Sequence, residues 1–183
     1  DLSYTTATGK KIFRELVKDA DLLEENFSPG VMERLGFDYE SLKRINSKLI
    51  MTGISNYGQT GPYRDWKMSE LTLNAMGADM YACGHPDYPP EKRVWDCLQY
   101  QGGLQAAVAA LGALFVARLQ GVGQYIDVSL FEVQAGDIDW KTLDTLSYSY
   151  SGETSPREAA LGLCVLPSGT FTCKDGYVRF LTT

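Results

Sequence analysis

The feature that most constrains the fold of this chain is an alternation of short apolar strands with helical segments. Residues 48–55 form the clearest strand, an apolar run of the kind that parallel strands buried on both faces show. Shorter strand patterns at 21–24 and 125–128 flank it, with helical spacing of apolar residues between them. Such an alternation predicts an α/β fold with a doubly wound, Rossmann-like parallel sheet.

The composition changes after Tyr148, and this change predicts a domain boundary. Residues 151–156 are polar and rich in turn formers, and the segments 169–173 and 177–181 flank the turn sequence Lys-Asp-Gly, as in an antiparallel hairpin. We therefore expect residues 1–148 to belong to a large domain and residues 149–183 to form a linker and the start of a smaller α+β domain. We also interpret the sequence as an internal fragment of a longer polypeptide.

Charge and cysteine usage exclude several classes of function. A net charge of −6 without basic clustering argues against a nucleic-acid partner. The longest apolar run, residues 106–117, is shorter than a membrane span needs. The cysteines are scattered and there is a single histidine, which predicts neither a disulfide framework nor a metal site. We expect a cytoplasmic protein with reduced thiols.

Three sequence blocks carry a resemblance to a known family. They are residues 25–36 (ENFSPGVMERLG), 54–62 (ISNYGQTGP) and 123–132 (GQYIDVSLFE). In this order and with these gaps the chain resembles the class III CoA-transferases, which include formyl-CoA transferase, carnitine CoA-transferases and the 2-methylacyl-CoA racemases. The resemblance implies a CoA-binding large domain and the transfer of CoA between an acyl-CoA and a small carboxylic acid. It implies coenzyme A as a substrate, with no permanently bound cofactor, and an interlocked dimer.

The first block suggests where CoA would bind. The turn at residues 26–30 follows a strand and opens a helix, an arrangement that favours anions at the carboxyl edge of a sheet, although an ordinary connection is the commoner reading of the turn alone. The resemblance places Asn26, Phe27 and Arg34 at positions that face CoA. It also places Lys67 near the CoA phosphate or the pantetheine arm, and for this lysine a solvated surface position is an equally good interpretation.

Gln99 is the residue on which the functional interpretation depends. It lies four residues before Gly103 at the start of a Gly/Ala-rich helix. The resemblance implies an aspartate here, whose carboxylate attacks the thioester and carries the acyl group as an anhydride. An amide is never anionic and is a feeble nucleophile, but it donates and accepts hydrogen bonds. We therefore expect Gln99 to orient a thioester carbonyl without being acylated.

Two other carboxylates could replace the missing acid. Asp96 lies three residues before Gln99 and shares its face on a continuous helix, but the spacing to the surrounding motifs favours Gln99 as the equivalent position. Glu132 ends the segment Ser-Leu-Phe-Glu, a capping-box pattern, which favours a structural role over a catalytic one.

The pair Ser69 and Glu70 stands where the racemases carry a proton-transferring histidine and an aspartate. Serine has no pKa near neutrality, so Ser69 cannot take over that proton transfer. We expect Glu70 to orient its neighbours or to cap a helix. With both proton-transfer positions replaced, a racemase is the least favoured function.

The sequence leaves three functions open. The first is a CoA-transferase subunit without its own nucleophile, as in two-subunit members of the benzylsuccinate CoA-transferase type, with a related subunit supplying the aspartate. The second is a self-sufficient transferase that uses a displaced carboxylate, and the third is a homologue that binds acyl-CoA without transforming it. We favour the first. Its expected partners are a CoA thioester, a small carboxylic acid, and a related subunit or second copy in an interlocked dimer, with neither nucleic acid nor a membrane.

Overall fold

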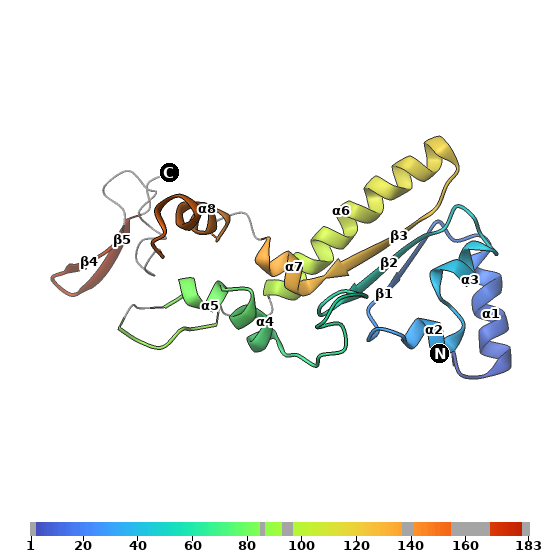
Figure 1. Cartoon of the computed structure of the whole chain (residues 1–183), viewed down its shortest axis with the longest axis horizontal. Helices are drawn as coiled ribbons and strands as arrows, with labels where there is room; N and C mark the ends of the chain where they lie inside the picture. The colour runs from blue at the N-terminus through green and yellow to red at the C-terminus, as the bar shows by residue number, and fades with distance from the viewer. Residues whose placement is uncertain (1–2, 85–86, 93–96, 137–140, 155–168, 181–183) are drawn as a thin grey trace. The chain divides into compact units, whose positions relative to one another are not determined.

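The computed structural model describes residues 3–84, 87–92, 97–136, 141–154 and 169–180 (Figure 1). The chain divides into two compact units. One comprises Asp1–Leu73 and Trp95–Gln134, and the other comprises Asn74–Val94 and Ala135–Thr183. The predicted Asp96 falls outside the described residues.

A parallel sheet of three strands forms the centre of the first unit. Its strands are β1 (Leu22–Glu25), β2 (Ile50–Ser55) and β3 (Gln124–Ser129), in the order β1-β2-β3. Both strand pairs are parallel, with Ile50 of β2 opposite Leu22 of β1 and Gln124 of β3. The three strands agree with the sequence prediction to within two residues. β2 is the middle strand, which explains its uninterrupted apolar run.

Helices cover both faces of this sheet, as a doubly wound fold requires (Figure 1). On one face lie α1 (Ala7–Val17), α2 (Val31–Leu35) and α3 (Tyr39–Lys43). A shared core holds them to the sheet, and its buried members are Val17, Phe37, Leu42, Leu49 and Met51. The other face is covered by α6 (Cys97–Gln120), which packs Ala113 and Ala117 against Ile50. The predicted fold class is therefore confirmed.

Local capping sets the starts of two of these helices. The Thr6 hydroxyl accepts a hydrogen bond from the backbone N–H of Gly9 at 3.1 Å and caps α1. The Asp38 carboxylate accepts one from the N–H of Ser41 at 2.9 Å and caps α3, and an aspartate before this helical segment is a residue type that predicts such a cap. Each cap satisfies a backbone donor that the first helical turn leaves free.

α6 is apolar on both of its faces. Its alanines pack against the sheet, whereas large side chains on the other side, such as Leu104, Leu111 and Phe115, are exposed. By length and composition this helix could cross a membrane, a test that the core helices of many globular proteins also meet. It contacts β2 and β3, and it is the helix that directly precedes β3 in the chain.

The apolar spacing of residues 69–81 predicts one continuous helix, and this prediction is wrong in one respect, because the structure divides the segment in two. α4 (Glu70–Met76) and α5 (Asp79–Ala82) are separated by Ala78, which has a φ of 65°. A left-handed residue ends a helix, and a residue with a Cβ adopts that conformation only at an energetic cost. Periodicity alone does not detect such a break, because the apolar spacing continues across it.

The second unit contains α8 (Lys141–Ser151) and an antiparallel hairpin of β4 (Gly169–Cys173) and β5 (Gly176–Phe180). Cys173 pairs with Gly176 across the turn, which confirms the predicted hairpin. α8 passes through the predicted domain boundary at residue 148, and the assignment of residues 149–183 to a small domain stays a prediction.

Candidate active site

A cavity of about 430 Å³ opens at the carboxyl edge of the parallel sheet, and we call it the Gln99 cavity. It is formed by the turn after β1, the end of β2, the starts of α4 and α6, and the first residue of α7 (Leu130–Ala135). In doubly wound folds ligands bind at this edge. The lining residues are Asn26, Phe27, Ser28, Pro29, Ile54, Ser55, Asn56, Met68, Ser69, Glu70, Gln99, Gly103 and Leu130.

Four of the residues singled out from the sequence meet in this cavity. Asn26 and Phe27 come from the turn after β1, Glu70 from the first turn of α4, and Gln99 from the first turn of α6. Gly103 lies one turn after Gln99, and a Cβ added to it would meet nothing within 4 Å. Gln99 itself is exposed, so a ligand that enters the cavity can reach its side chain.

Glu70 holds the start of α6 in place. One of its carboxylate oxygens accepts a hydrogen bond from the backbone N–H of Leu98 at 3.1 Å. A carboxylate at the N-terminus of a helix satisfies a free donor and interacts favourably with the helix dipole. Leu98 is buried against Leu73 and Tyr57 directly beside this bond. Glu70 thereby holds the backbone of the residue next to Gln99, and its role in the site stays a prediction.

Ser69 also serves the local structure. Its hydroxyl accepts a hydrogen bond from the N–H of Thr72 at 3.4 Å, and the Thr72 hydroxyl accepts one from the N–H of Ser69 at 2.9 Å. These reciprocal bonds form a cap at the start of α4. The residue in the place of the racemase histidine therefore lines the cavity as part of a helix cap.

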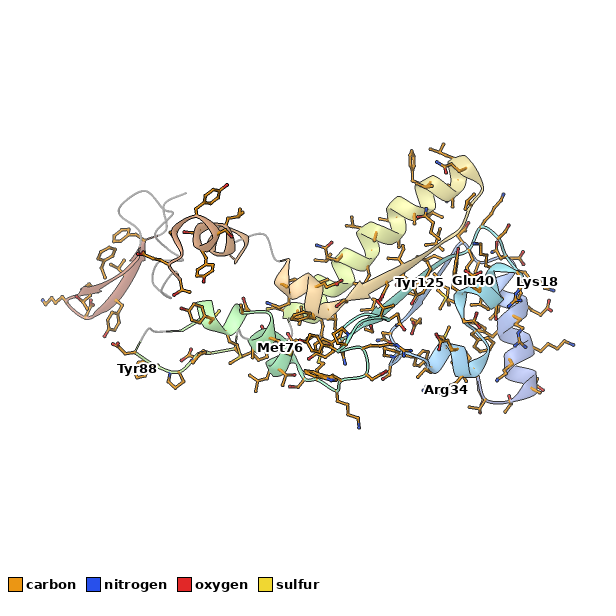
Figure 2. The ribbon with its side chains drawn as sticks, in the orientation of Figure 1. Lys18, Arg34, Glu40, Met76, Tyr88 and Tyr125 are labelled. Carbon is orange, nitrogen blue, oxygen red and sulfur yellow. The ribbon has the colours of Figure 1, made fainter. Side chains whose placement is uncertain are left out.

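The structure does not bring the other described candidates, Lys67, Arg34 and Glu132, into the Gln99 cavity. Lys67 is exposed in the loop before α4, and Arg34 is exposed on α2 (Figure 2). Glu132 is exposed in α7, where its N–H donates to the Ser129 hydroxyl at 3.2 Å, in keeping with the predicted capping box. None of these three residues lines the cavity.

Arg64 is a candidate that sequence reasoning missed. An ideal Cβ at Gly30 would lie 3.1 Å from Arg34 Nη1 and 3.5 Å from Arg64 Nη2, so both guanidinium groups lie over this glycine. The Arg64 Nε atom is buried and has no hydrogen-bond partner in the part of the chain that the structure describes. Two neighbouring guanidinium groups suit an anion such as phosphate. The only signal in the sequence was the position of Arg64, two residues after the GQTGP motif.

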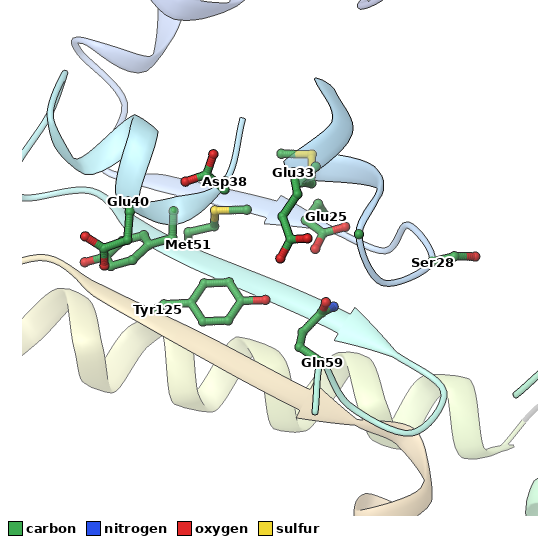
Figure 3. A pocket seen from close by; sticks show the side chains of 11 residues that line it. Glu25, Ser28, Glu33, Asp38, Glu40, Met51, Gln59 and Tyr125 are labelled. Atoms are coloured by element: carbon green, nitrogen blue, oxygen red, sulfur yellow. The ribbon is translucent and has the colours of Figure 1, made fainter. Parts of the chain in front are cut away.

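A second cavity, of about 560 Å³, is lined by residues of α2, α3 and the three strands and is acidic (Figure 3). The carboxylates of Glu25 and Glu33 and the side chain of Gln59 face the hydroxyl end of Tyr125. Burial, with the nearby charges of Asp127 and Glu25, raises the pKa of Tyr125 to about 12. Burial also raises the pKa of Glu25, and the charge of Asp127 raises it further. A hydrogen bond of 2.8 Å from the N–H of Phe27 to the Glu25 carboxylate lowers the pKa and offsets part of this rise. Gly30, over which Arg34 and Arg64 lie, also lines this cavity, so acidic and basic side chains lie close together there.

The raised pKa of Glu25 gives a testable pH dependence. Because the pKa is higher in the folded than in the unfolded chain, ionised Glu25 destabilises the fold at neutral pH, and this cost disappears as the pH falls below its ordinary value of 4.5. We expect Glu25→Gln to raise the free energy of unfolding at pH 7 and to match the wild type at pH 4, as measured by urea denaturation. Glu24→Gln, the same change of charge at an exposed neighbour, should have little effect at either pH. An equal gain for Glu25→Gln at both pH values would contradict the assignment.

The comparison with known sequences decides the family. The profile of CoA-transferase family III matches residues 1–183, the whole chain. The chain belongs to CoA-transferase family III. Family III relatives include the acetyl-CoA:oxalate CoA-transferase of Acetobacter aceti, which is 35% identical over 167 residues, 91% of this chain and 42% of the relative. The succinyl-CoA–L-malate CoA-transferase beta subunit of Chloroflexus aurantiacus is 35% identical over 172 residues, 92% of this chain and 41% of the relative.

Solved structures agree with this family III assignment. A CAIB/BAIF family protein from Brucella suis superposes with a TM-score of 0.84 at 33% identity, covering 96% of this chain and 46% of that protein. Rv3272 from M. tuberculosis gives a TM-score of 0.79 at 25% identity, covering 97% of this chain and 45% of that protein. The chain thus spans less than half the length of the relatives that it matches. Family III enzymes use CoA thioesters as substrates, in agreement with the expected ligand class.

Proposed function

We propose that this chain takes part in the transfer of CoA between an acyl-CoA and a carboxylic acid as a subunit that lacks its own nucleophile. The observation that carries the proposal is the position of Gln99. It lines the cavity at the carboxyl edge of the sheet together with Asn26, Phe27 and Glu70, and its side chain is an amide. The family resemblance assigns this position to the acyl-carrying aspartate.

The chemistry explains why an amide matters here. In the proposed reaction a carboxylate oxygen attacks the thioester carbonyl carbon, the C–S bond breaks, and CoA leaves as a thiolate while an acyl anhydride remains. The thiolate then attacks the aspartyl carbonyl of the anhydride, which releases the donor acid and leaves an aspartyl-CoA thioester. From there CoA passes to the acceptor acid. Gln99 cannot start this sequence, and Glu70 already accepts a hydrogen bond from the Leu98 N–H.

We further propose that a related subunit supplies the aspartate. The L-malate CoA-transferase of Chloroflexus aurantiacus has an alpha and a beta subunit, and this chain is 35% identical to each. Such relatives show that two similar chains of this family can occur in one enzyme, which supports a heteromer and also leaves room for an interlocked homodimer. We place the reaction in the cytoplasm, in keeping with the free thiols of Cys83, Cys97 and Cys173.

Activity of the purified chain tests this proposal. The chain alone should bind CoA but exchange CoA between acetyl-CoA and a carboxylic acid no faster than a blank, and addition of a family III subunit with aspartate at the equivalent position should restore turnover. Robust turnover by the chain alone would reject the proposal. It would favour instead a displaced carboxylate, and hydroxylamine trapping with peptide mapping would distinguish Asp96 from Glu132.

The alternative is a homologue that holds an acyl-CoA without transforming it. The amide and hydroxyl groups that line the cavity around Gln99 favour it as much as they favour a non-nucleophilic subunit. The two functions differ in the effect of the partner. Calorimetric binding of acetyl-CoA combined with no turnover in any mixture of subunits would support the binding homologue.

The arginine pair over Gly30 gives a prediction for CoA binding. We expect Arg64→Ala to weaken CoA binding about tenfold, because one charge-assisted hydrogen bond to phosphate is lost, and to leave pantetheine binding unchanged. Calorimetry at two salt concentrations measures both affinities. The control is Lys18→Ala, which removes the cation that follows the end of α1 and pairs with Glu15 at the surface (Figure 2). An equal loss for CoA and pantetheine would contradict a role in phosphate binding.

A further inference from the structure

Ser55 is the feature of the Gln99 cavity that the proposed function does not use. It is the last residue of β2, it lines the cavity, and it is only 6% exposed. Its hydroxyl oxygen is buried and has no hydrogen-bond partner among the described residues. Ser129 lies opposite Ser55 on β3, and its hydroxyl accepts the N–H of Glu132. The Ser129 hydroxyl therefore caps a helix, whereas the Ser55 hydroxyl makes no hydrogen bond within the described structure.

A buried hydroxyl without a hydrogen-bond partner destabilises a fold. At the wall of a cavity, such a hydroxyl can gain its missing hydrogen bond from a bound ligand. Thr52 provides the comparison within the same strand. It is fully buried, and its hydroxyl also has no partner in the described structure, but it does not line the cavity. Only Ser55 can gain a hydrogen bond from a molecule that enters the Gln99 cavity.

The residues that line the cavity indicate which chemical group of the bound molecule lies next to Ser55. The polar side chains of the cavity are amides, hydroxyls and the carboxylate of Glu70, and among the described residues that line it there is no Lys, Arg or His. The charge of Glu70 disfavours a second carboxylate nearby. The N-terminus of the 24-residue helix α6 also opens here and favours an acceptor with partial negative charge. A neutral carbonyl oxygen fits this set better than an anion does.

We propose that the Ser55 hydroxyl donates a hydrogen bond to the thioester carbonyl oxygen of a bound acyl-CoA. The inference rests on the proposed function, because it needs acyl-CoA in the Gln99 cavity. The bond selects the thioester over free CoA. The same carbonyl oxygen gains negative charge when a carboxylate attacks the carbonyl carbon. A hydrogen-bond donor already in place at this oxygen stabilises that charge.

Two ligands that differ at this carbonyl test the proposal on the full chain. Acetyl-CoA carries the carbonyl oxygen, and S-ethyl-CoA has the same carbon skeleton without it. We expect the wild type to bind acetyl-CoA about tenfold more tightly than S-ethyl-CoA by calorimetry, and Ser55→Ala to abolish this preference while binding S-ethyl-CoA as the wild type does. Thr52→Val is the matched control. It removes the other unpartnered hydroxyl of β2 and should keep the preference.

Stability is the second readout, because it distinguishes a binding hydroxyl from a structural one. Ser55→Ala removes an unsatisfied buried group and should leave the melting temperature of the free protein equal or higher, as should Thr52→Val. A clear fall in the melting temperature of Ser55→Ala, or a preference for acetyl-CoA that survives this substitution, overturns the inference. Equal binding of the two ligands by the wild type also overturns it. Failure to bind either ligand overturns the proposed function and the inference with it.

Discussion

The Gln99→Asp variant is expected to form a covalent acyl-enzyme that the wild-type chain does not form. The substitution places a carboxylate on the first turn of α6, in the cavity that Asn26, Phe27 and Glu70 also line. Removal of a catalytic nucleophile costs on the order of 10⁶ in rate, so even an imperfectly placed aspartate should raise the rate of labelling at least about 100-fold. Intact-mass analysis after incubation with acetyl-CoA measures the adduct, and hydroxylamine should release it.

Two controls make this experiment specific for the position. Gln99→Asn keeps a neutral amide on the shorter side chain and should stay unlabelled. Gln101→Asp introduces the same carboxylate two residues further along α6, at a residue that does not line the cavity, and should also stay unlabelled. Equal labelling of Gln99→Asp and Gln101→Asp would show that the cavity does not orient the thioester toward position 99.

The Gly123→Ala variant is expected to lose about 3 kcal/mol of stability, at the upper end of the costs of overpacking. Gly123 is buried just before β3, and its N–H donates to the carbonyl oxygen of Ser47 at 2.9 Å. A Cβ at this position would lie 2.8 Å from the carbonyl carbon of Lys48 and closer still to the carbonyl oxygen of Leu49. These are backbone atoms at the start of β2, and they cannot rotate away. Urea denaturation followed by circular dichroism measures the loss.

Gly112→Ala is the matched control for this effect. Gly112 lies within α6, and a Cβ there would meet nothing within 4 Å. Alanine is favoured over glycine in a helix interior by about 1 kcal/mol, so this variant should be more stable than the wild type. If both substitutions destabilise the chain alike, the close approach of Gly123 to the backbone before β2 is not present in solution.

The sequence predicted those parts of the fold that local patterns determine. The apolar run of β2, the Asp38 cap and the Lys174–Gly176 turn each carry their signal within a few neighbouring residues, and the structure confirms all three. The break at Ala78 was missed, because a positive φ at an alanine leaves no mark in the apolar spacing. Alanine occurs in helices, strands and loops, so its identity at position 78 does not indicate a left-handed backbone conformation.

The candidate site was predictable where motifs place residues at the end of a strand or in the first turn of a helix. Asn26, Glu70 and Gln99 lie far apart in the chain, and the order of the parallel strands brings them to one edge. The proximity of Arg64 to Arg34 depends on the path of the loop after β2, and the unpartnered hydroxyl of Ser55 depends on what its neighbours already bond. Neither property belongs to a residue type or a spacing, so only the structure reveals them.

The most direct test of the missing nucleophile is peptide mapping of the wild-type chain after incubation with acetyl-CoA and hydroxylamine. An acylated carboxylate is converted by hydroxylamine to a hydroxamate, which marks the residue that carried the acyl group. Our account predicts no hydroxamate on any residue of this chain, and one on the aspartate of an added family III subunit. A hydroxamate on Asp96, Glu70 or Glu132 of this chain would contradict it.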